Sequence, residues 1–146
     1  MNGIMKKWKV VSVVESILLV DGDATTRDAM KFILELNGYR VVEAHHGIEA
    51  LQVLNEWGGD IQLALCGPDL PDMTGPEWLS QLRFLGPEVP AVMLSEKDCV
   101  EVAEMAVGSA YGDMPAKPPA PVKLLEKIRR ALDDHFFSRC ERASAA

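Results

Sequence analysis

Two carboxylates follow a short apolar run near the start of the chain. In the stretch ILLVDGDAT, residues 17–25, Asp21 and Asp23 are separated by one glycine. Carboxylate oxygens could bind a divalent cation such as Mg²⁺. The same pair could supply a nucleophile and a general acid, or it could form a polar turn that caps a helix. Which of these three roles applies depends on the strands and helices that position the two residues.

Short apolar runs alternate with longer amphipathic stretches along the chain. The apolar runs are typical of strands buried on both faces of a parallel sheet, and they occupy residues 16–20, 40–43, 62–66, 91–94 and, more weakly, 111–116. Helical spacing follows each run, over residues 25–37, over 47–57, from Pro76, from Asp98 and from about Pro121. Asp98 with Glu101 predicts a capping box at the fourth helix.

This order predicts the α/β class, with a doubly wound, five-stranded parallel sheet and helices on both faces. In such sheets the functional site lies outside the carboxyl ends of the strands. Each of four residues ends or closely follows a predicted strand, which places them on one rim: Asp21, Gly67, Ser95 and Lys117.

The composition excludes several classes of protein. A net charge of −7 argues against non-specific binding to nucleic acid or to an anionic membrane surface. No apolar run is long enough to predict a membrane-spanning helix. The three cysteines lack a CxxC pair and a zinc pattern, which favours reduced thiols in a cytoplasmic protein. We expect an N-terminal arm over residues 1–15, one domain over 16–138 and a tail over 139–146.

Five motifs in order carry a resemblance to a known family over about residues 17–136. They are ILLVDGD, GYRVVEAHHGIEALQVL, LPDMTG, VPAVMLSE and AKPPAPVKLLEKIRRAL. With these motifs the chain resembles the receiver domain of two-component response regulators, which has the flavodoxin-like (βα)5 fold. The resemblance implies phosphoryl transfer from a histidine kinase to an aspartate after the third strand. It also implies a Mg²⁺ ion held by that aspartate and the acidic loop, a lysine that pairs with the phosphoryl oxygens, and a Ser or Thr hydroxyl that moves toward them.

The chain departs from the family at the residues that do this chemistry. Counting back from the proline of LPDMTG places the acceptor at Gly67, and the second acidic position is Gly22. Met114 stands where the family has an aromatic switch residue, whereas Asp21, Ser95 and Lys117 are kept. Cys66 precedes Gly67, so strand alternation points its thiol to the opposite face, into the core. We therefore predict a pseudo-receiver that is not an enzyme, holds no cofactor beyond weak Mg²⁺ and works through protein contacts.

One alternative keeps phosphorylation at a relocated acceptor. Asp69 lies two residues after Gly67, and a shifted loop could gather Asp21, Asp23 and Asp69 around a cation. The competing interpretation makes Asp69 and Asp72 solvated turn residues and Asp23 the cap of the first helix.

A second alternative is a small phosphatase of the haloacid dehalogenase type. DGDAT fits the Asp-x-Asp-x-Thr motif of that family, in which the first aspartate is the nucleophile and the second the general acid, with Mg²⁺ between them. Ser95, Lys117 and the pair 133–134 could complete such a site. The placement argues against it, because Thr25 leads directly into a helix and residues 133–134 lie within a helical pattern.

The resemblance also implies where partners bind. In receivers, the fourth helix, fifth strand and fifth helix form a common interface with a partner or a second copy. Basic residues mark the last helix here: Lys123, Lys127, Arg129 and Arg130. We expect a protein partner on this face, either a histidine kinase or a second copy, with no nucleic acid and no membrane.

Overall fold

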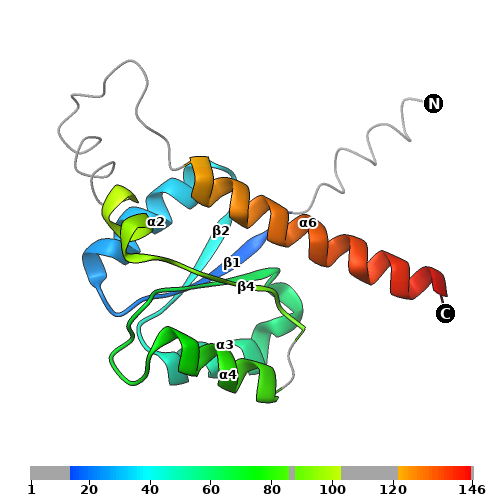
Figure 1. The fold of residues 1–146 in the computed structure, drawn as a ribbon, viewed down its shortest axis with the longest axis horizontal. Helices are drawn as coiled ribbons and strands as arrows, with labels where there is room; N and C mark the ends of the chain where they lie inside the picture. Colours follow the sequence, from blue (N-terminus) through cyan, green and yellow to red (C-terminus); the bar gives the residue numbers. More distant parts are fainter. Residues whose placement is uncertain (1–13, 86–87, 103–121, 146) are drawn as a thin grey trace.

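A computed structural model describes residues 14–85, 88–102 and 122–145, with side chains in the last helix described over 123–134. Strands and helices alternate along the chain (Figure 1). The strands are β1 (Ser16–Val20), β2 (Arg40–Ala44), β3 (Leu63–Cys66) and β4 (Ala91–Met93). The helices are α2 (Ala24–Leu36), α3 (Gly47–Trp57), the short η1 (Gly58–Asp60), α4 (Gly75–Leu85), a helical stretch over 96–102, and α6 (Val122–Ala145).

The described strands form one parallel sheet in the order β2-β1-β3-β4. The crossover from β2 over β1 to β3 places β1 at the centre, where all five of its residues are buried. The predicted parallel α/β class is confirmed. The fifth predicted strand, residues 111–116, lies outside the described residues.

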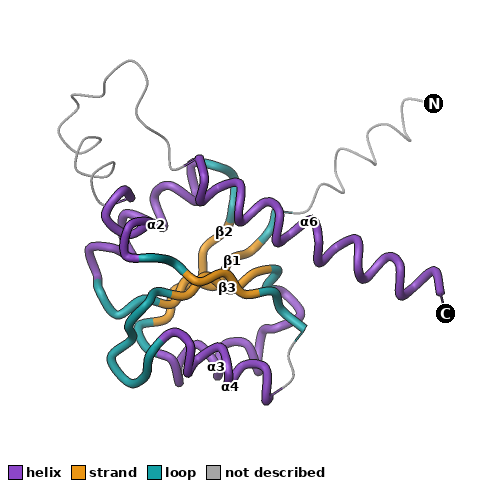
Figure 2. The backbone as a smooth tube through the Cα atoms, in the orientation of Figure 1, coloured by secondary structure: helices purple, strands orange, loops and turns teal. Residues whose placement is uncertain are grey.

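Helices cover both faces of the sheet (Figure 2). The layer under α2 and α6 includes Ile17, Leu19, Met30, Leu63, Leu65, Leu124 and Ile128. The layer under α3 and α4 includes Leu18, Val20, Leu54, Ala64, Cys66, Trp78 and Leu82. Successive β1 residues thus alternate between the two layers, as the period of a strand requires.

The first helix begins and ends where its sequence signals predict. The Asp23 carboxylate accepts from the Thr26 amide at 3.1 Å and from the Thr26 hydroxyl at 2.6 Å, which satisfies a donor at the start of α2. Gly38 follows the helix with φ +87°, a left-handed conformation that favours glycine. The prediction that Asp23 caps this helix is confirmed.

The predicted capping box of Asp98 with Glu101 is wrong. The Asp98 amide donates to Ser95 Oγ at 3.0 Å, and the Ser95 amide donates to Asp98 Oδ2 at 3.0 Å. The helix therefore begins at residue 96, with Ser95 as its N-cap and Asp98 as the third residue of its first turn. The two-way bond explains the shift, because Ser95 offers both an acceptor and an amide donor to the same carboxylate residue.

The last helix continues past residue 138, where the sequence predicts the end of the domain. Residues 139–145, expected in the tail, continue α6 to Ala145. The boundary between domain and tail therefore stays a prediction. Within the described ranges, no helix combines the length and apolar character needed to cross a membrane.

Candidate functional site

The carboxyl ends of the central strands bring the predicted rim residues together. Val20 pairs with Cys66, and Cys66 pairs with Met93, so the residues that follow these strands meet at one edge. The Gly67 amide donates to the Val20 carbonyl at 2.8 Å and closes the ladder at this edge. Lys117 and Met114 lie outside the described residues.

The Asp21 carboxylate fills the space where a side chain at position 67 would begin. A Cβ built on Gly67 would lie 2.6 Å from Asp21 Oδ2 and 3.0 Å from Asp21 Cγ. Asp21 itself is 5% exposed, and its Oδ1 accepts from the Asp23 amide at 2.9 Å. The Asp21 carboxylate is therefore packed against Gly67, the predicted acceptor position.

Burial sets the electrostatic state of Asp21. Desolvation raises the pKa of this carboxyl above its usual range, against the hydrogen bond from the Asp23 amide, which lowers it.

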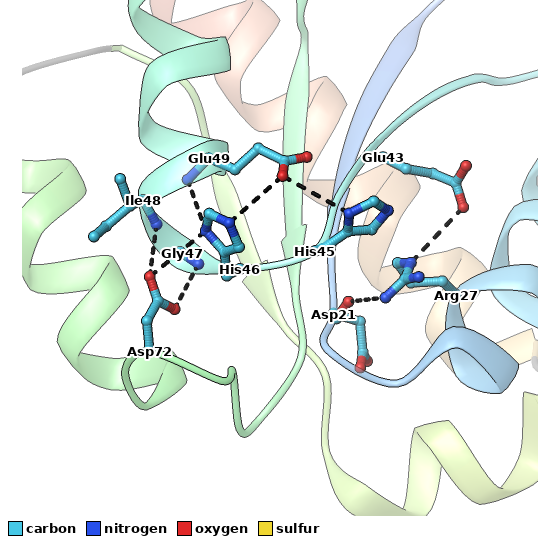
Figure 3. A network of polar contacts seen from close by, with 9 residues as sticks. All are labelled: Asp21, Arg27, Glu43, His45, His46, Gly47, Ile48, Glu49 and Asp72. Atoms are coloured by element: carbon cyan, nitrogen blue, oxygen red, sulfur yellow. Dashed lines mark hydrogen bonds and ion pairs between the residues drawn. The ribbon is translucent and has the colours of Figure 1, made fainter.

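Arg27 helps to hold the turn after β1, because its Nη1 donates to the Asp21 main-chain oxygen at 2.7 Å (Figure 3). Arg27 Nε lies 4.0 Å from Glu43 Oε1, which links α2 to β2.

Pro71 packs against Gly22, the predicted position of the second acid. A Cβ built on Gly22 would lie 2.7 Å from Pro71 Cδ and 2.9 Å from Pro71 Cγ. A proline ring has little freedom to move aside, since it is fused to the backbone. The loop that carries LPDMTG thus packs directly on the loop after β1.

The neighbouring thiol faces away from this edge. Cys66 is fully buried in the layer under α3 and α4, as predicted. Burial, with a smaller contribution from the charge of Asp21, raises the pKa of the Cys66 thiol to about 12. A protonated core thiol is a poor nucleophile, which agrees with the predicted core role of Cys66.

Asp69 and Asp72 have different roles in the loop after β3. Asp69 is exposed and pairs with Thr74 in an isolated antiparallel bridge, as expected for a turn residue. The Asp72 carboxylate instead accepts from the Gly47 amide at 2.8 Å and the Ile48 amide at 3.0 Å (Figure 3). Asp72 is exposed in the turn, as predicted, and it also caps α3 from another segment, which was not predicted.

The histidine pair belongs to the same helix start. His46 is the N-cap of α3, and its Nδ1 accepts from the Glu49 amide at 3.2 Å. His45 is exposed, with Nδ1 3.8 Å from Glu49 Oε2. These contacts agree with a loop and capping role. No group of three or more His, Cys, Asp or Glu side chains among the described residues is arranged to hold a metal ion.

Two carboxylates proposed for a phosphatase have contacts of their own. Asp23 caps α2, and Thr25 lies within that helix. Asp133 lies in α6, where its carboxylate accepts from Arg129 Nη2 at 2.9 Å. The phosphatase interpretation stays a hypothesis, because Lys117 lies outside the described residues.

Three residues make contacts at the site that the sequence does not predict. Arg27 and Asp72 bond to main-chain groups, and Lys127, expected on the partner-binding face, has its Nζ 3.6 Å from Asp98 Oδ2. Asp72 and Gly47 are 25 residues apart, so no local motif predicts their contact.

The geometry at Asp72 predicts a change in acid stability for Asp72→Asn. Burial raises the pKa of this carboxyl, but the hydrogen bonds from Gly47 and Ile48 outweigh it and hold the pKa below its usual range. A lowered folded-state pKa gives stability that is present above about pH 4 and is lost as the pH falls through the folded value. Urea denaturation at a series of pH values should show a flatter acid limb for Asp72→Asn than for the natural protein. An acid limb of unchanged slope in Asp72→Asn would contradict the role given to these two hydrogen bonds.

The chain matches the family model described as response regulator receiver domain over residues 17–129. A response regulator named MprA from Mycobacterium ulcerans is 32% identical over 116 residues, which cover 80% of this chain and 49% of that protein. MprA from Mycobacterium tuberculosis strain H37Rv is also 32% identical, with 50% of its length covered. The chain thus spans about half the length of the curated relatives it matches.

Solved structures show the same fold. A CheY-like receiver domain protein from Methanospirillum hungatei is 33% identical with a TM-score of 0.62, covering 86% of this chain and 99% of that chain. NtrX from Brucella abortus is 26% identical with a TM-score of 0.67, covering 92% of this chain and 30% of that chain. The matched region contains the rim formed by Asp21, Gly67 and Ser95.

Proposed function

This chain belongs to the response regulator receiver domain family of two-component signalling, and from that premise we propose that it is a pseudo-receiver. In this proposal it takes no phosphoryl group at the usual position and acts through contacts with another protein. One observation carries the proposal: Gly67 offers no acceptor oxygen, and the Asp21 carboxylate lies 2.6 Å from where its side chain would begin.

The remaining site supports a receiver without the family's Mg²⁺ ion. Mg²⁺ requires near-octahedral oxygen ligands and is commonly held by more than one carboxylate. Of the three carboxylates that the family uses, only Asp21 remains, and it is buried against Gly67 and bonded to the Asp23 amide. Pro71 closes the place of the second acid at Gly22. These residues do not fit the metal, so the proposal contains no metal-dependent step and no enzymatic turnover.

The proposed output is a protein contact in the cytoplasm. The family's interface corresponds here to the helix that begins at residue 96, the predicted strand over 111–116 and α6. The second of these lies outside the described residues. Lys123 and Arg130 are exposed on the described part of α6, whereas the Arg129 guanidinium is bound by the carboxylates of Glu15 and Asp133. A histidine kinase or a second copy of the chain is the proposed partner.

Intact mass after incubation with Mg²⁺ and acetyl phosphate tests this proposal. The natural chain and an Asp69→Asn variant should both keep their unmodified mass, while a receiver with its acceptor aspartate gains a phosphoryl group under the same conditions. A labelled natural chain with an unlabelled variant would mean that the acceptor has moved to Asp69. Label on both chains would place the acceptor elsewhere, and either result would overturn the pseudo-receiver.

A further inference from the structure

Ser95, the residue that the family uses as its switch, is joined to α6 through one carboxylate. Ser95 and Asp98 exchange two hydrogen bonds at the start of the helix over 96–102, each 3.0 Å long. The same Asp98 oxygen that accepts from the Ser95 amide lies 3.6 Å from Lys127 Nζ on α6. A continuous polar chain therefore runs from the rim of the sheet to the last helix.

Asp98 is built into this position. It is 8% exposed, in a helix turn whose neighbours Glu96 and Lys97 are exposed. A buried carboxylate is costly unless hydrogen bonds and an opposite charge compensate it. Burial raises its pKa, yet the bonds from Ser95 and the charge of Lys127 outweigh burial and hold the pKa below its usual range. The structure thus satisfies Asp98 in its ionised form.

The contacts of Asp98 hold both the Ser95 hydroxyl and the helix over 96–102 in place. The Ser95 hydroxyl oxygen accepts from the Asp98 amide, so the hydroxyl serves as the helix cap. The helix itself is tied to α6, and its Val102 packs in the same core layer as Leu124 and Ile128 of α6. In a chain that receives no phosphoryl group, these contacts supply a structural reason for the two helices to keep one arrangement.

We propose that Asp98 and Lys127 form a latch that holds the helix over 96–102 against α6 and presets the partner-binding face without phosphorylation. That this face is preset without phosphorylation rests on the proposed function. The latch itself is a statement about the unmodified chain, so it can be tested apart from phosphorylation.

Hydrogen exchange of the natural and variant chains, read on peptides that cover residues 94–102, tests the latch. The Asp98 and Cys99 amides donate to Ser95, at 3.0 and 3.1 Å, and so report whether the cap is closed. Asp98→Ala should speed their exchange by roughly five-fold or more, because about 1 kcal/mol is a factor of about five. Lys127→Met, which keeps the aliphatic stem, should give a smaller increase of roughly two- to five-fold, and Lys127→Arg should restore protection.

Two matched variants provide the controls. Glu101→Ala removes an exposed carboxylate from the same helix, and Lys123→Met removes an exposed lysine one turn earlier on α6. Neither should change exchange over residues 94–102. Combining Asp98→Ala with Lys127→Met should add little to Asp98→Ala alone, because both changes break one interaction.

Each result decides the matter. Local loss of protection in the latch variants, with β1 peptides unchanged, supports the latch. Unchanged exchange in Lys127→Met overturns it, even where Asp98→Ala speeds exchange, because Asp98 also bonds to the Ser95 amide without Lys127. An equal rise in the β1 peptides overturns it too, because that reports global destabilisation. Exchange measured before acetyl phosphate is added keeps this outcome separate from the proposed function, which fails only if the natural chain gains mass afterwards.

Discussion

A Gly67→Asp variant should unfold at a lower urea concentration than the natural protein and should remain unphosphorylated by acetyl phosphate. The new Cβ would lie 2.6 Å from Asp21 Oδ2, so the Asp21 carboxylate must move out of a buried position. Overpacking of this kind typically costs roughly 1–3 kcal/mol. The added carboxylate then lies beside a second one in a partly desolvated site, where like charges disfavour ionisation of both.

Gly67→Ala separates the steric effect from the charge effect. Alanine brings the same Cβ without the carboxylate, so its stability loss measures the contact with Asp21 alone. The gap between the two variants should grow as the pH rises from about 4 toward neutrality. The sign follows from the raised pKa of a carboxyl pair: the folded state retains a proton that the unfolded state releases, so stability falls with rising pH.

Phosphorylation should stay absent even when aspartate occupies both predicted acidic positions, 22 and 67. In a chain that carries Gly67→Asp with Gly22→Asp, the second substitution places a Cβ 2.7 Å from Pro71 Cδ. The proline ring is part of the backbone and yields less readily than the end of a side chain. Intact mass with Mg²⁺ and acetyl phosphate is the measurement. A phosphoryl group on either variant would mean that the loops around Asp21 relax more easily than their packing indicates.

Periodic signals made most of the fold predictable. The run at residues 16–20 and the helical spacing at 47–57 match β1 and α3 residue for residue, because a buried strand and an amphipathic helix each impose their own period. The assignment of Gly67 to the acceptor position depends only on counting from a motif, and it stays a prediction. The contact between Gly67 and the Asp21 carboxylate was not predictable, because Asp21 lies 46 positions before Gly67 and only the sheet brings them together.

Capping contacts mark the limit of prediction from the sequence. Asp23 was found because it directly precedes the helix it caps. Asp72 was missed because it caps α3 across 25 residues of sequence, from a loop that the sheet folds back onto that helix. The sequence predicts a capping box at Asp98, one turn after the observed N-cap, Ser95. The family resemblance predicts a switching role for Ser95, whereas in the structure its hydroxyl caps the helix.

Trp78→Ala should produce the largest loss of stability among the single substitutions considered. Trp78 is a residue of α4 and is fully buried in the layer between that helix, α3 and the sheet, and its Nε1 donates to the Gly47 carbonyl at 3.1 Å. Replacing a buried tryptophan with alanine removes packing and leaves a cavity, at a cost of roughly 3–5 kcal/mol. Trp78→Phe should cost less, since it retains most of the packing but loses the hydrogen bond, itself worth roughly 1 kcal/mol.

Trp57→Ala is the matched control, because Trp57 is 58% exposed on α3. Its loss should stay within about 0.5 kcal/mol, as is usual for exposed positions. Urea denaturation followed by far-ultraviolet circular dichroism compares the variants without relying on tryptophan fluorescence. Equal losses for Trp57→Ala and Trp78→Ala would contradict the packing of the α3 and α4 layer. Trp78 and Asp72 both bond to Gly47 at the start of α3, so the loss in Trp78→Ala includes a contact with that helix start as well as core packing.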